Sequence, residues 1–154
     1  KSMNTSVQVN VRYLHTVWGE SPLAYSTQDS VGLDLKACLD QDFLNLAPGN
    51  RQAVPAGVAI EILTPGIAGF IFSRSGLGTK EGLVVSQGVG VIDPDYRGEI
   101  IVSILNTSQL ERTIHAGQRI AQLLFMPAYQ ARLFAVDCLS TTPRGHGGFG
   151  HTGK

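Results

Sequence analysis

The sequence predicts an all-β fold, a sandwich or barrel of about ten short strands with at most one short helix. Short segments alternate apolar and polar residues or carry runs of β-branched residues, which is typical of strands. Turn signals built from Gly, Pro, Asn and Asp recur at spacings of about eight to twelve residues. No segment sustains a helical period of apolar residues over about three turns.

The N-terminal half contains the first predicted strands. Residues 7–14 and 33–39 alternate apolar and polar side chains, as half-buried strands do. Gly, Ser and Pro punctuate the stretch between them and predict a loop over residues 18–28. Further strands in this half are expected at residues 43–46, at 51–57 leading into 58–63, and at 67–72.

The C-terminal half continues the same pattern after one interruption. Residues 73–81 lack strand alternation and predict a turn or one short helix. Apolar runs at 82–85 and 100–105 flank an Asp-Pro turn, so they predict two strands joined through that turn. The remaining strands are expected at residues 111–115, 119–127 and 131–136.

Length and composition favour one globular domain and exclude several classes of partner. The 154 residues are 43% hydrophobic and 16% charged, with a formal net charge of zero. Bulk electrostatics therefore recruit neither nucleic acid nor membrane, and no apolar run reaches the roughly 18 residues of a membrane helix. Cys38 and Cys138 form no CxxC pair, so we expect reduced thiols and a cytoplasmic protein.

The C-terminus differs from the rest of the chain. Five of the eleven residues in 144–154 are glycine, and the others are polar except Phe149. Such a segment contributes nothing to a core, so we predict a β domain over 1–143 and a flexible tail over 144–154. Arg144, Phe149 and the glycine N–H groups are suited to closing over a nucleotide, although a disordered terminus has the same composition.

The turn after residue 90 holds more chemistry than a turn needs. Asp93 precedes Pro94, and a carboxylate fixed in this way can act as a general base toward water. We interpret Asp95 as a turn residue and Arg97 as an ion-pair partner. Tyr96 fits two roles equally, packing against a sugar or packing in the core.

Other candidate residues each have a structural alternative. Residues 73–78, Ser-Arg-Ser-Gly-Leu-Gly, suit a phosphate but also suit a solvated turn. Asp34, on an apolar strand, is expected to pair, to cap a turn or to hold a cation. Gln118 fits a phosphate contact and Gln122 fits a buried hydrogen bond, and either residue also fits plain surface. The four histidines show no metal-ligand spacing, so we expect no zinc site.

Five segments in order resemble the five motifs of the trimeric dUTPases, and most of all the bacterial type. The matching segments are residues 32–35, 74–77, 90–99, 117–122 and 144–153. The resemblance implies a jelly-roll-like domain that assembles as a homotrimer with shared active sites, the tail of one chain covering another's site. It also implies Mg²⁺-assisted hydrolysis of dUTP to dUMP and pyrophosphate, which keeps uracil out of DNA and supplies dUMP for dTMP synthesis.

The same resemblance implies a role for particular residues. Asp93 matches the residue that activates the water attacking the α-phosphorus, and Tyr96 matches the tyrosine under deoxyribose. Residues 87–92 match the hairpin that reads uracil, and Asp34 matches a carboxylate near the metal, acting through water. The implied substrate-binding set is Arg74, Ser75, Gly76, Gln87, Val91, Ile92, Tyr96, Ile101, Gln118, Arg144, Phe149, Gly150, His151 and Thr152.

Within this set, Arg144 would hold the γ-phosphate, Phe149 would stack on uracil, and Thr152 with nearby glycines would contact phosphates. Two positions depart from the family pattern. Gln87 stands where the family commonly has Asn, and His151 stands where many members have Ser. A histidine there makes the local charge depend on pH.

Two other functions remain open on the sequence. A dCTP deaminase shares the fold, but it calls for a glutamate or similar group at the pyrimidine, and the residues following Tyr96 and the Phe149 tail favour the diphosphatase. A non-catalytic, nucleotide-gated interaction module is the second alternative, and the intact Asp93 argues against it.

Overall fold

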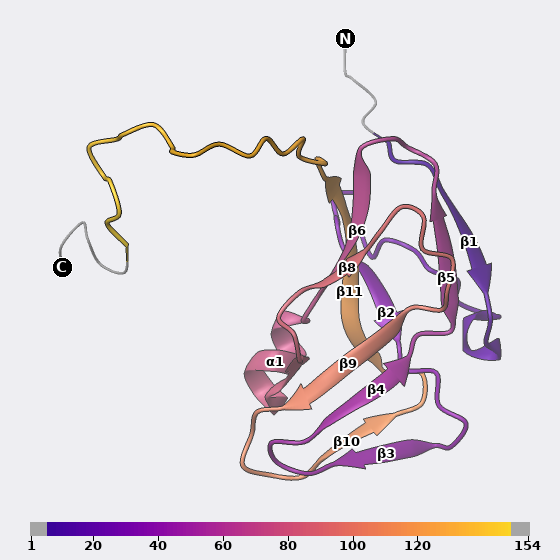
Figure 1. Ribbon diagram of the computed structural model, residues 1–154. Coiled ribbons are helices and arrows are strands. Elements are labelled where there is room, and N and C mark those ends of the chain that lie inside the picture. The colour runs from indigo at the N-terminus through magenta and orange to yellow at the C-terminus, as the bar shows by residue number, and fades with distance from the viewer. Residues whose placement is uncertain (1–5, 149–154) are drawn as a thin grey trace.

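The computed structural model describes residues 6–148 and confirms the all-β prediction (Figure 1). Eleven strands and one α-helix occur in this range, together with a 3₁₀ turn, η1, at Thr16–Trp18. The strands are β1 Val9–Tyr13, β2 Leu33–Lys36, β3 Phe43–Leu46, β4 Arg51–Pro55, β5 Val58–Ile62, β6 Ile67–Phe72, β7 Leu83–Val85, β8 Gly90–Ile92, β9 Ile101–Asn106, β10 Arg112–His115 and β11 Arg119–Pro127, and the helix is α1, Ser75–Glu81.

All of these strands pair antiparallel, in four sheets. The largest has the order β2-β11-β6-β8, and a second has the order β4-β9-β7. Two-stranded pairs, β1-β5 and β3-β10, complete the body, which Figure 1 shows at its right edge and lower end respectively. One apolar cluster joins the two larger sheets, with Leu35, Ile71 and Leu123 from the first and Val54, Val102 and Ile104 from the second.

The predicted connection around the Asp-Pro turn is confirmed and proves to be more elaborate. β7 and β9 pair in register, Leu83 opposite Asn106, as two strands joined through a turn should. The segment between them also contains β8, which leaves this sheet and pairs with β6. The turn therefore connects two sheets, with β8 on one side of it and β9 on the other.

The predicted short helix is α1, which directly follows β6. Its C-terminus is set by Gly82, whose φ of 71° is left-handed and favours glycine. The Gly82 N–H donates to the carbonyl oxygen of Gly78 at 3.0 Å and ends the helix. Leu77 packs into the core and orients the helix against β7.

One predicted strand is wrong. Residues 131–136 form no strand, because they lie on an extended arm, residues 128–148, that leaves the body after β11 (Figure 1). A strand requires a hydrogen-bonded partner, and the chain places none beside this segment among residues 6–148. Tyr129, Leu133 and Leu139 are 94%, 88% and 86% exposed, so the β body ends near Pro127. No helix in the described part of the chain is long and apolar enough to cross a membrane.

Candidate functional site

The first group of candidate residues surrounds a pocket between α1 and the start of β11. This α1–β11 pocket has a volume of about 440 Å³. The structure thus brings together Arg74 and Gly76, from the end of β6 and the first turn of α1, with Gln118, from the turn before β11. The complete lining is Arg74, Gly76, Leu77, Lys80, Glu81, Gly117, Gln118 and Arg119.

Asp34 fixes two arginines at the edge of this pocket. Its Oδ1 accepts from Arg74 Nε at 2.7 Å, and its Oδ2 accepts from Arg119 Nη1 at 3.1 Å. Side-chain exposures are 23% for Asp34, 28% for Arg74 and 56% for Arg119, so the first pair is partly shielded from water. The expectation that Asp34 pairs is confirmed, and the two guanidiniums lie together despite their mutual repulsion.

The residues of the α1–β11 pocket do not form a direct coordination site for a metal ion. Both Asp34 oxygens already face guanidiniums, which does not fit direct coordination of a cation. No group of three or more His, Cys, Asp or Glu side chains positioned for a metal occurs within residues 6–148. Mg²⁺ is usually held by waters and substrate phosphates with one or two carboxylates, so these residues fit an ion that arrives with a polyphosphate.

Hydrogen bonds fix the positions of Gln118 and Gln122, the two glutamines of segment 117–122. Gln118 Oε1 accepts from the His115 N–H at 2.9 Å, which closes the turn before β11. A backbone N–H only donates, so the amide oxygen must face it and Nε2 keeps its donors for another partner. Gln122 Nε2 donates to the Ser73 carbonyl at 3.0 Å, which confirms the predicted structural hydrogen bond and anchors the residue before Arg74.

The second group of candidate residues lies on the turn after β8. The Tyr96 N–H donates to the Asp93 carbonyl at 3.0 Å, so residues 93–96 form a β-turn with Pro94 in its second position, which proline favours. Asp93 is exposed, and no hydrogen bond or ion pair engages its carboxylate in the range the structure describes. Tyr96, 43% exposed, donates its hydroxyl to the Glu99 carbonyl at 2.9 Å.

The neighbouring β8 segment presents one side chain outward. Val91 is 59% exposed, whereas Ile92 is 8% exposed and belongs to the core, so Ile92 offers a ligand its backbone. Ile101, at the start of β9, is 45% exposed. Gln87 is exposed, and its Oε1 accepts from Ser86 Oγ at 3.0 Å.

One chain does not bring the two groups together. Within the antiparallel β6–β8 pair, Ile92 faces Gly69. Asp93, the next residue, therefore lies beside the N-terminal end of β6. Arg74 follows the other end of β6. At about 3.3 Å per residue, the backbones of Asp93 and Arg74 are separated by roughly 20 Å along the strand.

The remaining predicted residues lie at the C-terminus. Arg144 is exposed on the arm, where the Gly147 N–H donates to its carbonyl at 3.0 Å. Ser75 is exposed at the start of α1. Phe149, Gly150, His151 and Thr152 lie outside the described residues.

Lys80 and Arg119 line the pocket but were not predicted as site residues. Arg119 directly follows Gln118 in the sequence. The turn position that predicted a phosphate contact for Gln118 could have predicted one for Arg119 as well. Lys80 becomes visible once residues 75–81 are taken as a helix, because Gly76 and Lys80 are then four residues apart and share a face.

Comparison with known proteins identifies the family. A family model described as dUTPase matches residues 21–153. A deoxyuridine 5'-triphosphate nucleotidohydrolase of Escherichia coli O9:H4 (strain HS) is 48% identical over 136 residues, which cover 88% of this chain and 89% of the relative.

Solved structures share the fold at lower identity. A variant of the dUTPase of Staphylococcus bacteriophage 80alpha with dUpNHpp has a TM-score of 0.81 and 23% identity, covering 96% of this chain and 99% of the other. A variant dUTPase from phage phi11 of S. aureus, with a structural Mg(II) ion, has a TM-score of 0.72 and 22% identity, covering 87% and 99%. On the extent of the sequence matches, this chain belongs to the dUTPase family.

Proposed function

We propose that this chain is a dUTP diphosphatase, which hydrolyses dUTP to dUMP and pyrophosphate. The observation that carries the proposal is the α1–β11 pocket, where Asp34 fixes Arg74 and Arg119 beside Gly76 and Gln118. Paired guanidiniums and a free amide donor are suited to the oxygens of a polyphosphate. The E. coli relative, 48% identical, is a deoxyuridine triphosphate nucleotidohydrolase.

Asp93 is the proposed general base. Its carboxylate is exposed and held on a Pro94 turn, so it can accept a proton from a water that attacks the α-phosphorus. The arginines stabilise the charge on the phosphate oxygens, which is most of what phosphoryl-type displacement asks of a protein. Ser75 and Gly76 add contacts, and a Cβ on Gly76 would meet nothing within 4 Å, which leaves room for a ligand.

Mg²⁺ is the proposed cofactor. It would supply charge neutralisation on the phosphates, and Asp34 would act on it through water because both of its oxygens already accept from arginines. The phi11 neighbour with its structural Mg(II) ion supports the choice of metal.

A homotrimer with shared active sites is also proposed. Asp93 and Arg74 lie at opposite ends of β6, and their separation favours a site in which the two groups come from different chains. The arm supports the same assembly, since exposed Tyr129, Leu133 and Leu139 need an apolar surface to cover them. Each tail would then close over a neighbour's site, with Arg144 on the γ-phosphate and Phe149, Gly150, His151 and Thr152 around the nucleotide.

Selectivity for deoxyuridine is assigned to the β8 turn. Gln87, Val91 and the Ile92 backbone would read uracil, and Tyr96 would lie under the deoxyribose where a 2′-hydroxyl has no room. Ile101, exposed at the start of β9, is the other proposed contact. The reaction would remove dUTP before it enters DNA and supply dUMP for dTMP synthesis. A cytoplasmic location fits the two free cysteines, Cys38 and Cys138.

The test is pyrophosphate release from dUTP, UTP, dTTP and dCTP, each with and without Mg²⁺. We expect release from dUTP with Mg²⁺, loss of at least about 100-fold in Asp93→Asn, and activity retained in the matched control Asp95→Asn. No release from any nucleotide would reject the enzyme and leave a binding role. Ammonia released from dCTP would instead identify a deaminase.

A further inference from the structure

We infer that Glu61 and Arg97 form a positioning clamp that sets the orientation of the turn carrying Asp93, and this inference rests on the proposed function. Neither residue belongs to the α1–β11 pocket or to the substrate-binding set. Arg97 follows the turn, and Glu61 lies on β5, a strand with no other proposed site residue. Positioning the turn is their proposed role, without contact to the substrate.

Arg97 holds the turn through its backbone. Its Nη1 donates to the Pro94 carbonyl at 2.7 Å and to the Tyr96 carbonyl at 3.2 Å. These two carbonyls flank Asp95, in the turn that the Tyr96 N–H closes on Asp93. The guanidinium therefore fixes the 94–95 and 96–97 peptide groups through Nη1 and leaves Nη2 for Glu61, which the single nitrogen of a lysine cannot do with the same geometry.

Glu61 holds the Arg97 side chain in place. Its Oε1 accepts from Arg97 Nη2 at 3.3 Å. Its Oε2 accepts from Asn10 Nδ2 at 2.8 Å, and Asn10 faces Glu61 directly in the β1–β5 ladder. The carboxylate thus links the guanidinium to a paired strand and is held on both oxygens.

A second anchor limits how the turn can move. Glu99 Oε1 accepts from the Gly57 N–H at 2.9 Å, and the Ile100 N–H donates to the Val58 carbonyl oxygen at 2.9 Å. These contacts tie the C-terminal side of the turn to the start of β5. With that side fixed, the Glu61–Arg97 contact decides the orientation of the rest.

Stability does not explain the clamp. The side chains of Arg97 and Glu61 are 53% and 41% exposed, and exposed ion pairs contribute little to folding. Orientation is the quantity they control, and a misplacement of about 1 Å can cost about 100-fold in rate. A clamp of this kind affects turnover and leaves the melting temperature almost unchanged.

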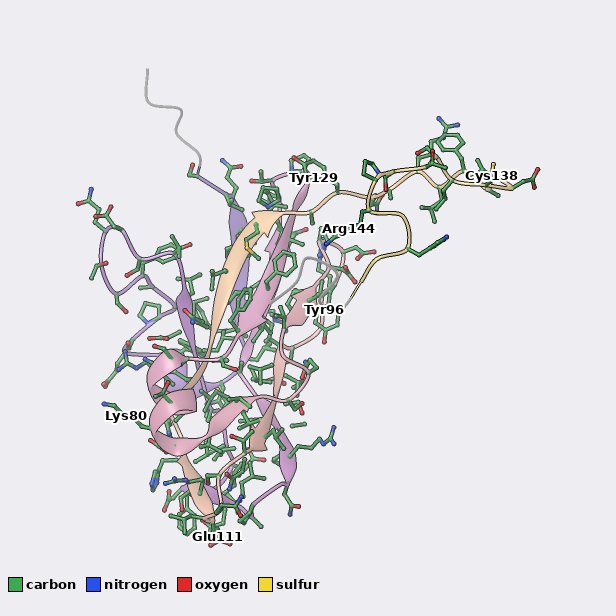
Figure 2. The ribbon with its side chains drawn as sticks, turned by 90° about the vertical axis from the view of Figure 1, so that its left-hand side faces the viewer. Lys80, Tyr96, Glu111, Tyr129, Cys138 and Arg144 are labelled. Atoms are coloured by element: carbon green, nitrogen blue, oxygen red, sulfur yellow. The ribbon has the colours of Figure 1, made fainter. Side chains whose placement is uncertain are left out.

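The experiment compares Arg97→Lys and Glu61→Gln with Arg51→Lys and Glu111→Gln. Arg51 is an exposed arginine on β4 with no ion pair among residues 6–148, and Glu111 is an exposed carboxylate far from the turn (Figure 2). For dUTP we expect kcat to fall about 10- to 100-fold in Arg97→Lys and about 5-fold in Glu61→Gln, with KM within about two-fold. The double variant should be no worse than Arg97→Lys, and the controls should match the wild type.

Amide hydrogen exchange supplies a readout independent of catalysis. The Tyr96 N–H should exchange faster in both clamp variants, while the Ile100 N–H keeps its wild-type rate. Unchanged kcat in the clamp variants of an active enzyme overturns the clamp, as does unchanged Tyr96 exchange or a fall in melting temperature that accounts for the lost activity. If the wild-type chain does not hydrolyse dUTP, the proposed function fails, and the exchange measurement still decides whether Glu61 and Arg97 hold the turn.

Discussion

Asp34 accepts from Arg74 Nε at 2.7 Å and joins β2 to the N-cap residue of α1, forty positions along the chain. The other carboxylate oxygen holds Arg119 at the start of β11. An acidic residue between two bases thereby organises a cationic pocket within a chain of zero net charge. The local arrangement of these charges therefore creates an anion-binding site that the net charge of the chain does not predict.

Asp34→Asn should lower kcat/KM for dUTP about 10- to 100-fold, because the two guanidiniums lose the charge that fixes their orientation. Steady-state kinetics over a series of Mg²⁺ concentrations checks this, with Asp40→Asn as an exposed control four residues after β2. Full recovery at high Mg²⁺ would show that Asp34 serves the metal and not the arginines.

Gly98→Ala should reduce the preference for dUTP over UTP about 10-fold, since a Cβ at Gly98 would lie 2.6 Å from Tyr96 Cζ and displace the ring. The measurement is the ratio of kcat/KM for the two nucleotides. Tyr96→Phe keeps the ring and loses only the hydrogen bond to Glu99, so it should keep the ratio at a stability cost of about 1 kcal/mol. A ratio unchanged in Gly98→Ala would remove Tyr96 from sugar selection.

Removing residues 144–154 should abolish most activity while the melting temperature stays within about 2 °C, because Phe149 is the one large apolar residue in this glycine-rich segment. Removing residues 128–154 should also change the oligomeric state, since Leu133, Phe134 and Leu139 are exposed on the isolated chain. Light scattering after gel filtration measures both forms. An unchanged oligomer in the longer deletion would contradict the assembly role of the arm.

Cys38 should resist alkylation in the native protein, because burial, with Glu99 nearby, raises the pKa of its thiol from 9.0 to about 11. Iodoacetamide at pH 8 should modify Cys138 alone, and both thiols should react in urea. In the native state the raised pKa keeps the thiol protonated above pH 9, where the unfolded thiol ionises. Stability from this group is therefore complete below pH 9 and declines as the pH rises toward 11. If iodoacetamide modified both thiols in the native protein, the expected protection of Cys38 would be refuted.

Short-range patterns determined much of this protein. Alternation at residues 7–14 and 33–39 predicted β1 and β2, and the break at residues 73–81 predicted a turn or the short helix α1, because side-chain period and turn chemistry are properties of neighbouring residues. The order of the chemical segments was equally visible, and it indicated the family that the comparisons then identified.

Tertiary structure alone decided which distant residues meet. It placed Arg74 and Arg119 on one Asp34, sent β8 to the sheet of β6, and separated Asp93 from Arg74. It also left residues 131–136 on the arm without a strand partner in the part of the chain that the structure describes, although their composition suits a strand. Strand pairing depends on contacts between residues far apart in the chain, and a local pattern carries the preference for a strand but not the identity of its partner.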